Sequence, residues 1–358
     1  MKILQVINSL QMGGAERLIT ELAPRLHKMG NDVDVLVLDG TETPFMKLLY
    51  SFGINVIKLN SNAKSPYSII NLFKLLPIVR RYDIVHSHTT PAQLHVAISR
   101  FFSRSFKAIT TEHSTNNHRR GNCFYKYADK IMYSLYDCVV CISELSKTKL
   151  QEQIGNRSDI KVIENGIDVD SFRAASPLMR ASINLSDSDY VLTMVGRFVD
   201  AKDQDTLIRA MALLPNHCKL VLVGLGPRRG YCEDLAKKLG VNERTVFLGE
   251  RDDVPSILHA SDIILMSSHW EGLSLSSLEG MSVGKPFLAS DVDGLREVVD
   301  GAGLLFEEGN ENNVADYVLK LMNDRDYSAI ISGRCLERAR KYDIMNAVKK
   351  YNDIYHQL

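Results

Sequence analysis

Short apolar runs alternate with longer amphipathic stretches along the chain. The first half contains seven apolar runs of strand length, at Ile3 to Ile7, Val33 to Leu38, Val56 to Leu59, Ile84 to His86, Ala108 to Thr111, Cys138 to Ile142 and Lys161 to Ile163. Between them, stretches such as Ala15 to Met29 have the length and spacing of amphipathic helices. Strands that alternate with helices form a parallel sheet covered on both faces. The first half is therefore predicted to be a doubly wound α/β domain.

The second half repeats this pattern. Its apolar runs lie at Val191 to Val195, Leu220 to Val223, Thr245 to Leu248, Asp262 to Met266, Phe287 to Ala289 and Gly303 to Phe306. The pattern predicts two Rossmann-like domains, residues 1–166 and residues 167–341, connected through the polar segment Asn165 to Pro177. Residues 342–358 have apolar side chains at helical spacing, and we expect this helix to return to the first domain.

Composition agrees with a globular protein of two domains. The 358 residues are 45% hydrophobic and 24% charged, and no apolar run has the length that crosses a bilayer. The opening sequence does not resemble a signal peptide, and six scattered cysteines fit a reducing cytoplasm. The pair Cys138-Val-Val-Cys141 has the spacing of a redox motif, but the apolar run around it predicts a buried strand.

Charge is unevenly distributed. The net charge is +0, yet residues 62 to 130 contain 11 lysines and arginines against three acids. Within this region, Phe101 to Lys107 and Asn116 to Arg120 mix cations with aromatic rings. Such a basic face suits an anionic partner or an anionic membrane surface. A nucleic acid has only this patch in its favour, and we do not expect one as a partner.

The segment Ser268 to Pro286 lies between two predicted strands and contains two carboxylates, Glu271 and Glu279, with seven residues between them. Gly272 allows a tight turn after the first carboxylate, and the serines that follow can cap the helix that carries the second. Ligands of open α/β sheets bind at such strand-to-helix loops, and phosphate binds at helix starts. We therefore expect phosphate at the amides and hydroxyl groups at the carboxylates.

Glycine turns follow two of the predicted strands. Gly13 and Gly14 immediately precede a helix, so the backbone can approach a ligand there and the helix start favours phosphate. This pair does not form the dinucleotide fingerprint Gly-x-Gly-x-x-Gly, and in Gly224-Leu-Gly226-Pro-Arg-Arg-Gly230 the last spacing is one residue too long. A nicotinamide-dependent dehydrogenase is disfavoured for this reason.

Arg197 and Lys202 are five residues apart in the loop that follows the strand Val191 to Val195. They can converge on one anion, the arginine as a planar fork and the lysine as a point charge. Fixed cations of this kind suit a leaving diphosphate, whose negative charge grows as its bond breaks.

Histidines gather near the strand ends of the first half, at His86, His88, His95, His113 and His118. None has the helical His-x-x-x-His spacing or the carboxylate partners of a metal site, so no metal is expected. Among them, His113 ends a strand on the side of the first sheet where ligands bind.

These motifs occur in the order of a known family. They are Gly13 to Glu16, Thr110 to His113, Val162 to Asp168, Gly196-Arg197 with Lys202, Val223 to Pro227, Val246 to Gly249 and Glu271 to Pro286. Over nearly its whole length the chain resembles the retaining, nucleotide-sugar-dependent glycosyltransferases of family 4, also described as glycosyl transferases group 1. The two glutamates, with Gly272 between them and Gly284-Lys-Pro286 after them, resemble the hallmark of that family. The resemblance implies the two-domain GT-B fold.

The resemblance implies that the second domain binds the donor. Arg197 and Lys202 would hold the diphosphate, and Glu279 would accept hydrogen bonds from ribose hydroxyls. The remaining donor-binding residues would be Gly226, Glu271 and the segment just after it, namely Gly272, Leu273, Ser274 and Leu275. The donor would be a UDP- or GDP-sugar, and the sequence leaves both the base and the sugar open.

The first domain would complete the reaction. By the same resemblance, Gly14 would bring its amide to the diphosphate, and His113 would contact the sugar near the reacting carbon, opposite Glu271. The implied mechanism is front-face attack with retention, in which the leaving phosphate takes the acceptor proton. The expected catalytic residues are thus His113, Glu271, Arg197 and Lys202, with no protein nucleophile, cofactor or bound metal.

The acceptor is expected on the first domain, with Arg119 and Arg120 as candidate contacts. Our hypothesis is a glycan or polyprenyl-diphosphate-linked acceptor in cell-surface polysaccharide synthesis, reached by a cytoplasmic enzyme whose basic face meets the inner side of the membrane. One departure from the family pattern is Ala302-Gly303, where Asn-Gly is usual. Two alternatives stay open: a sugar-nucleotide epimerase with the same fold, and a scaffold protein that has lost activity.

Overall fold

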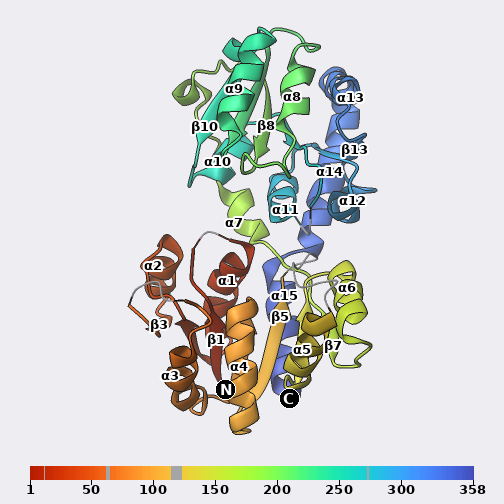
Figure 1. The fold of residues 1–358 in the computed structure, drawn as a ribbon. Coiled ribbons are helices and arrows are strands. Elements are labelled where there is room, and N and C mark those ends of the chain that lie inside the picture. The colour runs from red at the N-terminus through yellow and green to blue at the C-terminus, as the bar shows by residue number, and fades with distance from the viewer. Residues whose placement is uncertain (12, 62–64, 114–122, 272–273) are drawn as a thin grey trace. The chain divides into compact units, whose positions relative to one another are not determined.

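The computed structural model describes residues 1–11, 13–61, 65–113, 123–271 and 274–358, and the chain divides into two compact units. Unit 1 comprises Met1–Gly166 and Ile344–Leu358, and unit 2 comprises Ile167–Asp343. Each unit is built on one parallel sheet (Figure 1). The predicted class, two Rossmann-like α/β domains with doubly wound parallel sheets, is therefore confirmed.

The sheet of unit 1 has seven strands in the order β3-β2-β1-β4-β5-β6-β7. The strands are β1 (Lys2–Ile7), β2 (Asp32–Val37), β3 (Asn55–Lys58), β4 (Ile84–His88), β5 (Lys107–Glu112), β6 (Cys138–Cys141) and β7 (Ile160–Val162). The helices are α1 (Gly14–Lys28), α2 (Pro44–Ser51), α3 (Ile69–Val79), α4 (Thr90–Phe102), α5 (Cys123–Ser134), α6 (Glu144–Ile154) and, from the end of the chain, α15 (Ile344–Gln357).

Alternate side chains of β1 enter different cores of unit 1. Ile3 and Ile7 pack with α1, α2 and α15, whereas Leu4 and Val6 pack with α3, α4, α5 and α6. Since side chains alternate along a strand, Gln5 shares the face of Ile3 and Ile7. Its amide therefore lies buried beneath α15, where it contacts Tyr355.

The sheet of unit 2 has six strands in the order β10-β9-β8-β11-β12-β13. The strands are β8 (Tyr190–Val195), β9 (Cys218–Val223), β10 (Thr245–Gly249), β11 (Ile263–Met266), β12 (Phe287–Ser290) and β13 (Leu304–Phe306). The α-helices are α7 (Val169–Ala174), α8 (Gln204–Met211), α9 (Arg229–Lys238), α10 (Val254–His259), α11 (Leu275–Ser282), α12 (Asp293–Val299), α13 (Glu311–Asn323) and α14 (Arg325–Lys341).

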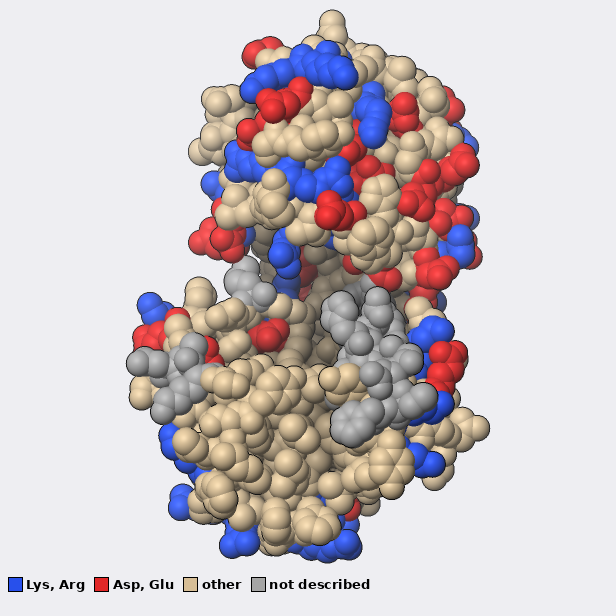
Figure 2. All heavy atoms as spheres, in the orientation of Figure 1, with Lys and Arg blue, Asp and Glu red and all other residues tan. Residues whose placement is uncertain are grey.

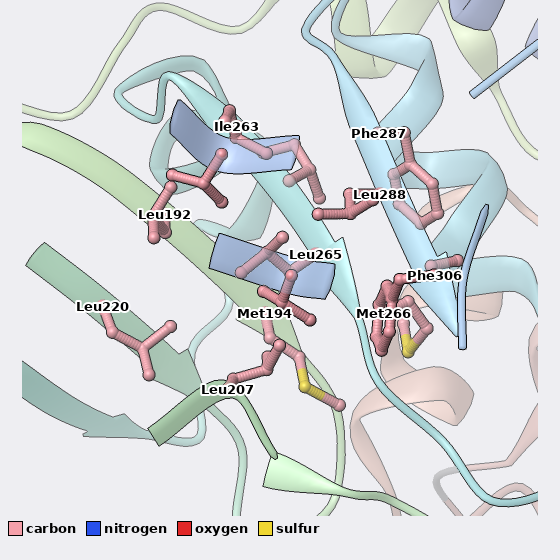
Figure 3. Packing of buried hydrophobic residues seen from close by; sticks show 14 of the residues in the cluster. Leu192, Met194, Leu207, Leu220, Ile263, Leu265, Met266, Phe287, Leu288 and Phe306 are labelled. Atoms are coloured by element: carbon pink, nitrogen blue, oxygen red, sulfur yellow. The ribbon is translucent and has the colours of Figure 1, made fainter. Parts of the chain in front are cut away.

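The main core of unit 2 packs on both faces of this sheet, since consecutive residues of β11 and β12 belong to it. Figure 3 shows side chains of neighbouring strands in contact there, among them Leu192, Met194, Leu265, Phe287, Leu288 and Phe306. Each buried side chain of this size stabilises the fold by about 1.5–3 kcal/mol relative to an exposed one. A smaller cluster that includes Val191, Val221 and Ile257 packs on the face opposite to Leu192 and Met194. The core thus fixes the strand ends from which the ligand-side loops emerge.

Two local features bear on the sequence-based expectations. Strand β4 runs to His88, two residues beyond the predicted end, because the side chains of His86 and His88 are buried and hydrogen-bonded. Cys138 and Cys141 lie in the buried strand β6, as predicted, and burial raises the pKa of their thiols to about 11 and about 12. In the described parts of the chain, no helix has the length and apolar character to span a membrane.

Candidate active site

Loops at the carboxyl ends of two strands of unit 2 bring Lys202 and Glu271 together. Lys202 lies between β8 and α8, and Glu271 follows β11. The Nζ atom of Lys202 donates a hydrogen bond to Oε1 of Glu271, and the Ser268 hydroxyl donates to the same oxygen at 3.0 Å. The two charged side chains are 14% and 16% exposed. A cation and a carboxylate from different loops are therefore held at one largely shielded point.

Arg197 lies in the same loop as Lys202 but is exposed. Its carbonyl oxygen accepts a hydrogen bond from Gln204 Nε2 at 3.1 Å, which anchors the loop to the start of α8. Its guanidinium forms no ion pair with any residue that the structure describes. The structure thus places both predicted cations in one loop, one already paired with a carboxylate and the other available to an anion.

Glu279 lies on α11 and is only 3% exposed. Glutamate is rarely buried to this degree, which distinguishes it from an ordinary helix-surface acid. The helix begins as predicted, because the Ser274 hydroxyl caps it by accepting a hydrogen bond from Ser277 N at 3.3 Å. Ser274 is buried and Leu275 is half-buried, whereas Gly272 and Leu273 lie outside the described residues.

The turn after β9 is held against the loop after β8. Gly226 has a φ of +157°, and a Cβ atom there would lie 2.2 Å from the carbonyl oxygen of Phe198. The backbones also exchange hydrogen bonds, from Phe198 N to Leu225 O at 3.0 Å and from Arg228 N to Phe198 O at 3.1 Å. Only glycine fits so close an approach. Gly226 therefore has a structural role, and its predicted contact with the donor stays a prediction.

The start of α1 in unit 1 is open. Gly13 caps the helix and Gly14 is its first residue, and both are exposed. A Cβ atom at Gly14 would meet nothing within 4 Å, so neither packing nor a positive φ requires glycine at this position. The α1 start thus leaves room for a ligand at the amides of the first turn, and the predicted binding of a diphosphate there stays a prediction.

Three histidines and a glutamine interact at the centre of unit 1. His88 Nδ1 lies 2.9 Å from His113 Nε2, and His88 Nε2 lies 2.8 Å from Gln5 Oε1. His86 contacts the Tyr355 hydroxyl through Nδ1 at 2.7 Å and the Thr111 hydroxyl through Nε2 at 2.7 Å. The predicted residue His113 is thus the outermost member of a buried polar network.

Burial keeps these histidines uncharged. Desolvation lowers the pKa of His86 and of His88 well below the ordinary value, and it lowers the pKa of His113 to about 4. At neutral pH each ring therefore has one N–H donor and one acceptor nitrogen. Among the described residues, no group of three histidine, cysteine or acidic side chains is arranged to hold a metal ion.

Three buried polar atoms at the strand ends of unit 1 have no hydrogen-bond partner within the described part of the chain: Asn8 Oδ1, Thr89 Oγ1 and His113 Nδ1. They follow β1, β4 and β5, which are neighbours in the parallel sheet. Unsatisfied buried polar atoms are few in native proteins, and a group of them marks a place where a polar ligand can bind.

Sequence reasoning missed Gln5, Asn8 and Thr89 as members of this site, and it noted His88 without assigning it a role. One signal was present, since Gln5 is the only uncharged polar residue in the apolar run of β1. Arg119 and Arg120, the candidate acceptor contacts, lie outside the described residues. The roles predicted for His113, Gly14 and the residues of unit 2 stay predictions.

Comparison with known proteins identifies the class. HepE of Anabaena, solved in complex with UDP, has a TM-score of 0.86 and 23% identity, with both chains covered completely. WaaG, a glycosyltransferase involved in lipopolysaccharide biosynthesis, has a TM-score of 0.71 and 16% identity over 99% of each chain. The two Rossmann-like units therefore form the GT-B fold of glycosyltransferases.

Family matches cover both units. Residues 12–171 match the family described as Glycosyltransferase Family 4, and residues 176–341 match Glycosyl transferases group 1. N-acetyl-alpha-D-glucosaminyl L-malate synthase of Bacillus anthracis is 25% identical over 97% of this chain and 94% of its own length. UDP-Gal:alpha-D-GlcNAc-diphosphoundecaprenol alpha-1,3-galactosyltransferase of Escherichia coli is 26% identical over 82% and 79%, respectively. The chain belongs to the glycosyl transferases group 1, with an amino-terminal domain of family 4.

Proposed function

We propose that this protein transfers a sugar, with retention of configuration, from a nucleoside-diphosphate sugar to a glycan or lipid-diphosphate-linked acceptor in cell-surface polysaccharide synthesis. The observation that supports it most is the contact between Lys202 and Glu271 at the strand ends of unit 2, with the exposed Arg197 in the same loop as Lys202. Two similar proteins are consistent with this function. HepE is described in complex with UDP-glucose, and the Escherichia coli relative is named for a UDP-Gal donor and a diphosphoundecaprenol acceptor.

In this proposal unit 2 holds the donor. Arg197 and Lys202 bind the diphosphate and stabilise the charge that develops on it as the bond to the sugar breaks. The ion pair explains how Lys202 is kept in place before the donor arrives, since Glu271 Oε1 and Met266 Sδ hold its ammonium group. Glu271 and the start of α11 then meet the sugar hydroxyls, and the buried Glu279 accepts from the ribose.

The proposed chemistry is a front-face substitution. The bond between the anomeric carbon and the diphosphate oxygen breaks, and the acceptor oxygen bonds to the same face of that carbon. The acceptor proton passes to the departing phosphate oxygen. A histidine with a pKa of about 4 does not compete for this proton at neutral pH, so we assign His113 to hydrogen bonding with the sugar. The proposal uses no protein nucleophile, no cofactor and no metal.

A thermal-shift panel of UDP, GDP, ADP and NAD tests the donor site. A ligand at about 100 times its dissociation constant stabilises the folded protein by roughly 2.7 kcal/mol. We expect either UDP or GDP to raise the Tm of the wild type and to raise that of Glu279→Gln less. A shift with NAD alone, or with none of the four, would contradict the proposal.

Product analysis separates transfer from the rival functions. A transferase releases the nucleoside diphosphate only when an acceptor is present, whereas an epimerase converts the donor without one. An inactive scaffold does neither, although it can keep the fold. Incubation of the stabilising nucleotide sugar with and without membrane extract, followed by chromatography of nucleotides, distinguishes all three.

We infer as well that unit 1 contacts an anionic membrane on the cytoplasmic side. Helices α3, α4 and α5 pack side by side and expose large apolar side chains. This α3–α5 surface consists of Tyr67, Ile69, Ile70, Phe73, Phe101, Phe102, Tyr125, Tyr127 and Ile131. Figure 2 shows this face as largely uncharged, with lysines and arginines gathered along its lower border.

The charges favour a membrane over a protein partner. Every exposed charged residue that the structure describes on α3, α4 and α5 is a lysine, namely Lys74, Lys126 and Lys130. Aromatic rings flanked by lysines suit the interface of an anionic bilayer, where the rings sit at headgroup level. The basic region predicted from the sequence, residues 62 to 130, thus contains the exposed apolar side chains of the α3–α5 surface.

Vesicle sedimentation tests the membrane contact independently of activity. We expect binding to vesicles that contain phosphatidylglycerol and weak binding to pure phosphatidylcholine. Phe73 and Phe101 are 70% and 68% exposed, so Phe73→Ser with Phe101→Ser should reduce binding without unfolding the protein. Ile330→Ser is the matched control, since Ile330 is 53% exposed on unit 2. Equal binding by both variants, or none by the wild type, would reject the contact.

A further inference from the structure

A continuous chain of hydrogen bonds crosses the interior of unit 1. It runs from His113 through His88 to Gln5, at 2.9 and 2.8 Å. Gln5 Nε2 then donates to the Tyr355 hydroxyl at 3.1 Å, and that hydroxyl lies 2.7 Å from His86 Nδ1. Because β1 and α15 are the elements that supply Gln5 and Tyr355, the two ends of the sequence meet in this chain.

The Gln5 amide sets the direction of these bonds. Its oxygen can only accept, so His88 Nε2 must carry the hydrogen. A neutral imidazole has one N–H, so His88 Nδ1 is an acceptor and the hydrogen between the two rings belongs to His113 Nε2. His113 Nδ1 is then left with its lone pair. The other side of the chain agrees, because Gln5 donates to Tyr355, whose hydroxyl donates to His86 Nδ1, and His86 Nε2 donates to Thr111.

The opposite direction is disfavoured by burial. With the Gln5 amide turned over, every hydrogen in the chain would move, and His113 Nδ1 would carry an N–H. This buried atom has no acceptor among the described residues. An unpaired buried N–H is rarer in native proteins than an unpaired acceptor. The orientation in which the Gln5 oxygen faces His88 and the Gln5 nitrogen faces Tyr355 is therefore favoured.

We propose that Gln5 and His88 are positioning residues that fix His113 as the Nε2–H tautomer, so that its Nδ1 accepts a hydrogen bond from a sugar hydroxyl. The identity of the ligand as a sugar rests on the proposed function, but the tautomer does not. His113 is in this way a specificity-determining residue: it favours a ligand that offers an O–H and disfavours one that offers only an acceptor.

Backbone strain next to His88 supports a functional role. Thr89 directly follows His88 and has φ 68° and ψ 147°. This region is occupied almost only by glycine, and a β-branched residue there is an outlier of the kind found at functional sites. The pKa values of the three histidines, all lowered by burial, support the argument because they keep the rings neutral and the tautomer defined.

Nitrogen NMR of the protein labelled with 15N-histidine tests the tautomer directly. Long-range 1H–15N spectra distinguish a protonated from an unprotonated ring nitrogen, and the signals missing in His113→Gln identify His113. We expect a protonated Nε2 and an unprotonated Nδ1 in the wild type at neutral pH. A protonated Nδ1 would overturn the proposal, whatever the enzyme's activity.

A pair of variants tests the role of Gln5. Gln5→Met keeps the size and removes the acceptor for His88, so His113 should populate both tautomers and kcat should fall about two- to tenfold. Tyr355→Phe removes the other partner of Gln5 and should leave the His113 tautomer unchanged. The same mixed spectrum in both variants would show that packing alone sets the ring. If Gln5→Met does not fold, the wild-type spectrum still shows which ring nitrogen of His113 carries the hydrogen.

Ligand titration addresses the accepted hydrogen bond. Addition of UDP-glucose or GDP-mannose should move the His113 Nδ1 signal, whereas UDP and GDP, which lack the sugar, should not. A shift with a sugar-free nucleotide would assign Nδ1 to another ligand group and contradict the proposed contact. If neither sugar nucleotide binds in the thermal-shift panel, the proposed function fails while the tautomer result stands.

Discussion

Lys202 donates a hydrogen bond to Glu271, and this bond joins the loop after β8 to the loop after β11 in the absence of any ligand. In the sheet these two strands are neighbours, so their carboxyl ends lie side by side. Both residues are assigned to the donor in the proposed function. The ion pair therefore holds two donor contacts ready in one place, and its removal should affect stability and catalysis differently.

We expect Lys202→Met to lower kcat by about 10²–10³-fold, because a fixed cation at a developing charge contributes that much. Stability should fall by about 1–3 kcal/mol, since a largely buried carboxylate loses its partner. In the double variant Lys202→Met with Glu271→Gln, stability should recover in part and activity should not. Chemical denaturation and steady-state kinetics measure the two effects. Recovery of activity in the double variant would mean that Lys202 acts only as a structural partner.

Gly226→Ala and Gly14→Ala should have opposite consequences. At Gly226 a Cβ atom would lie 2.2 Å from Phe198 O, so we expect a loss of about 2–4 kcal/mol in unfolding free energy. At Gly14 a Cβ atom meets nothing within 4 Å, and alanine in a helix should change stability by about 1 kcal/mol or less. Donor binding should nevertheless weaken, because the methyl group stands at the open helix start.

Urea denaturation and a donor titration of the two variants check this pair. Unchanged donor binding by Gly14→Ala would remove the α1 start from the proposed site. A Gly226→Ala protein as stable as the wild type would show that the turn after β9 can move away from Phe198.

The fold could be predicted from the sequence because strands and helices alternate with regular apolar spacing. Both sheets are parallel and buried, so each strand reads as a short apolar run, as in Val191 to Val195. The start of α11 could also be predicted, since the cap of Ser274 is a local interaction. Such features depend on residues close together in the chain.

Interactions between distant residues could not be predicted in this way. The bond between Gln5 and Tyr355 joins positions 350 apart, and the bond between Gln5 and His88 joins positions 83 apart. The sequence places each residue on its own element, but the contact depends on how α15 returns to unit 1. For the same reason Lys202 and Glu271 were predicted as ligands of one donor, and their direct bond was not.

Arg197→Gln should reduce donor binding without loss of stability. The guanidinium is exposed and has no ion pair among the described residues, so we expect a change in Tm close to zero. The dissociation constant for the nucleoside diphosphate should rise about tenfold, as for the loss of one charged hydrogen bond. Arg334→Gln, at an exposed position of α14, is the control with unchanged binding. Equal affinity of the two variants, measured by calorimetry, would exclude Arg197 from the diphosphate site.

Stability should fall in mild acid because of the buried histidines. The pKa of His113 is about 4 in the folded protein and near 6.5 in the unfolded chain, and those of His86 and His88 are also lowered. Below pH ~6.5 the unfolded state therefore binds more protons than the folded state. The histidine contribution to the free energy of unfolding is complete above this pH and is lost as the pH falls toward 4.

Urea denaturation between about pH 7.5 and about pH 4.5 measures this slope in the wild type and in His113→Gln, because this range spans the titration of histidine. The variant should lose less stability over the range, because it lacks a histidine whose pKa is lowered by desolvation. His217→Gln is the control, since His217 is an exposed histidine of unit 2. If the wild type and His113→Gln show the same slope, protonation of His113 does not oppose folding, and the ring is more accessible to water than its burial in this network implies.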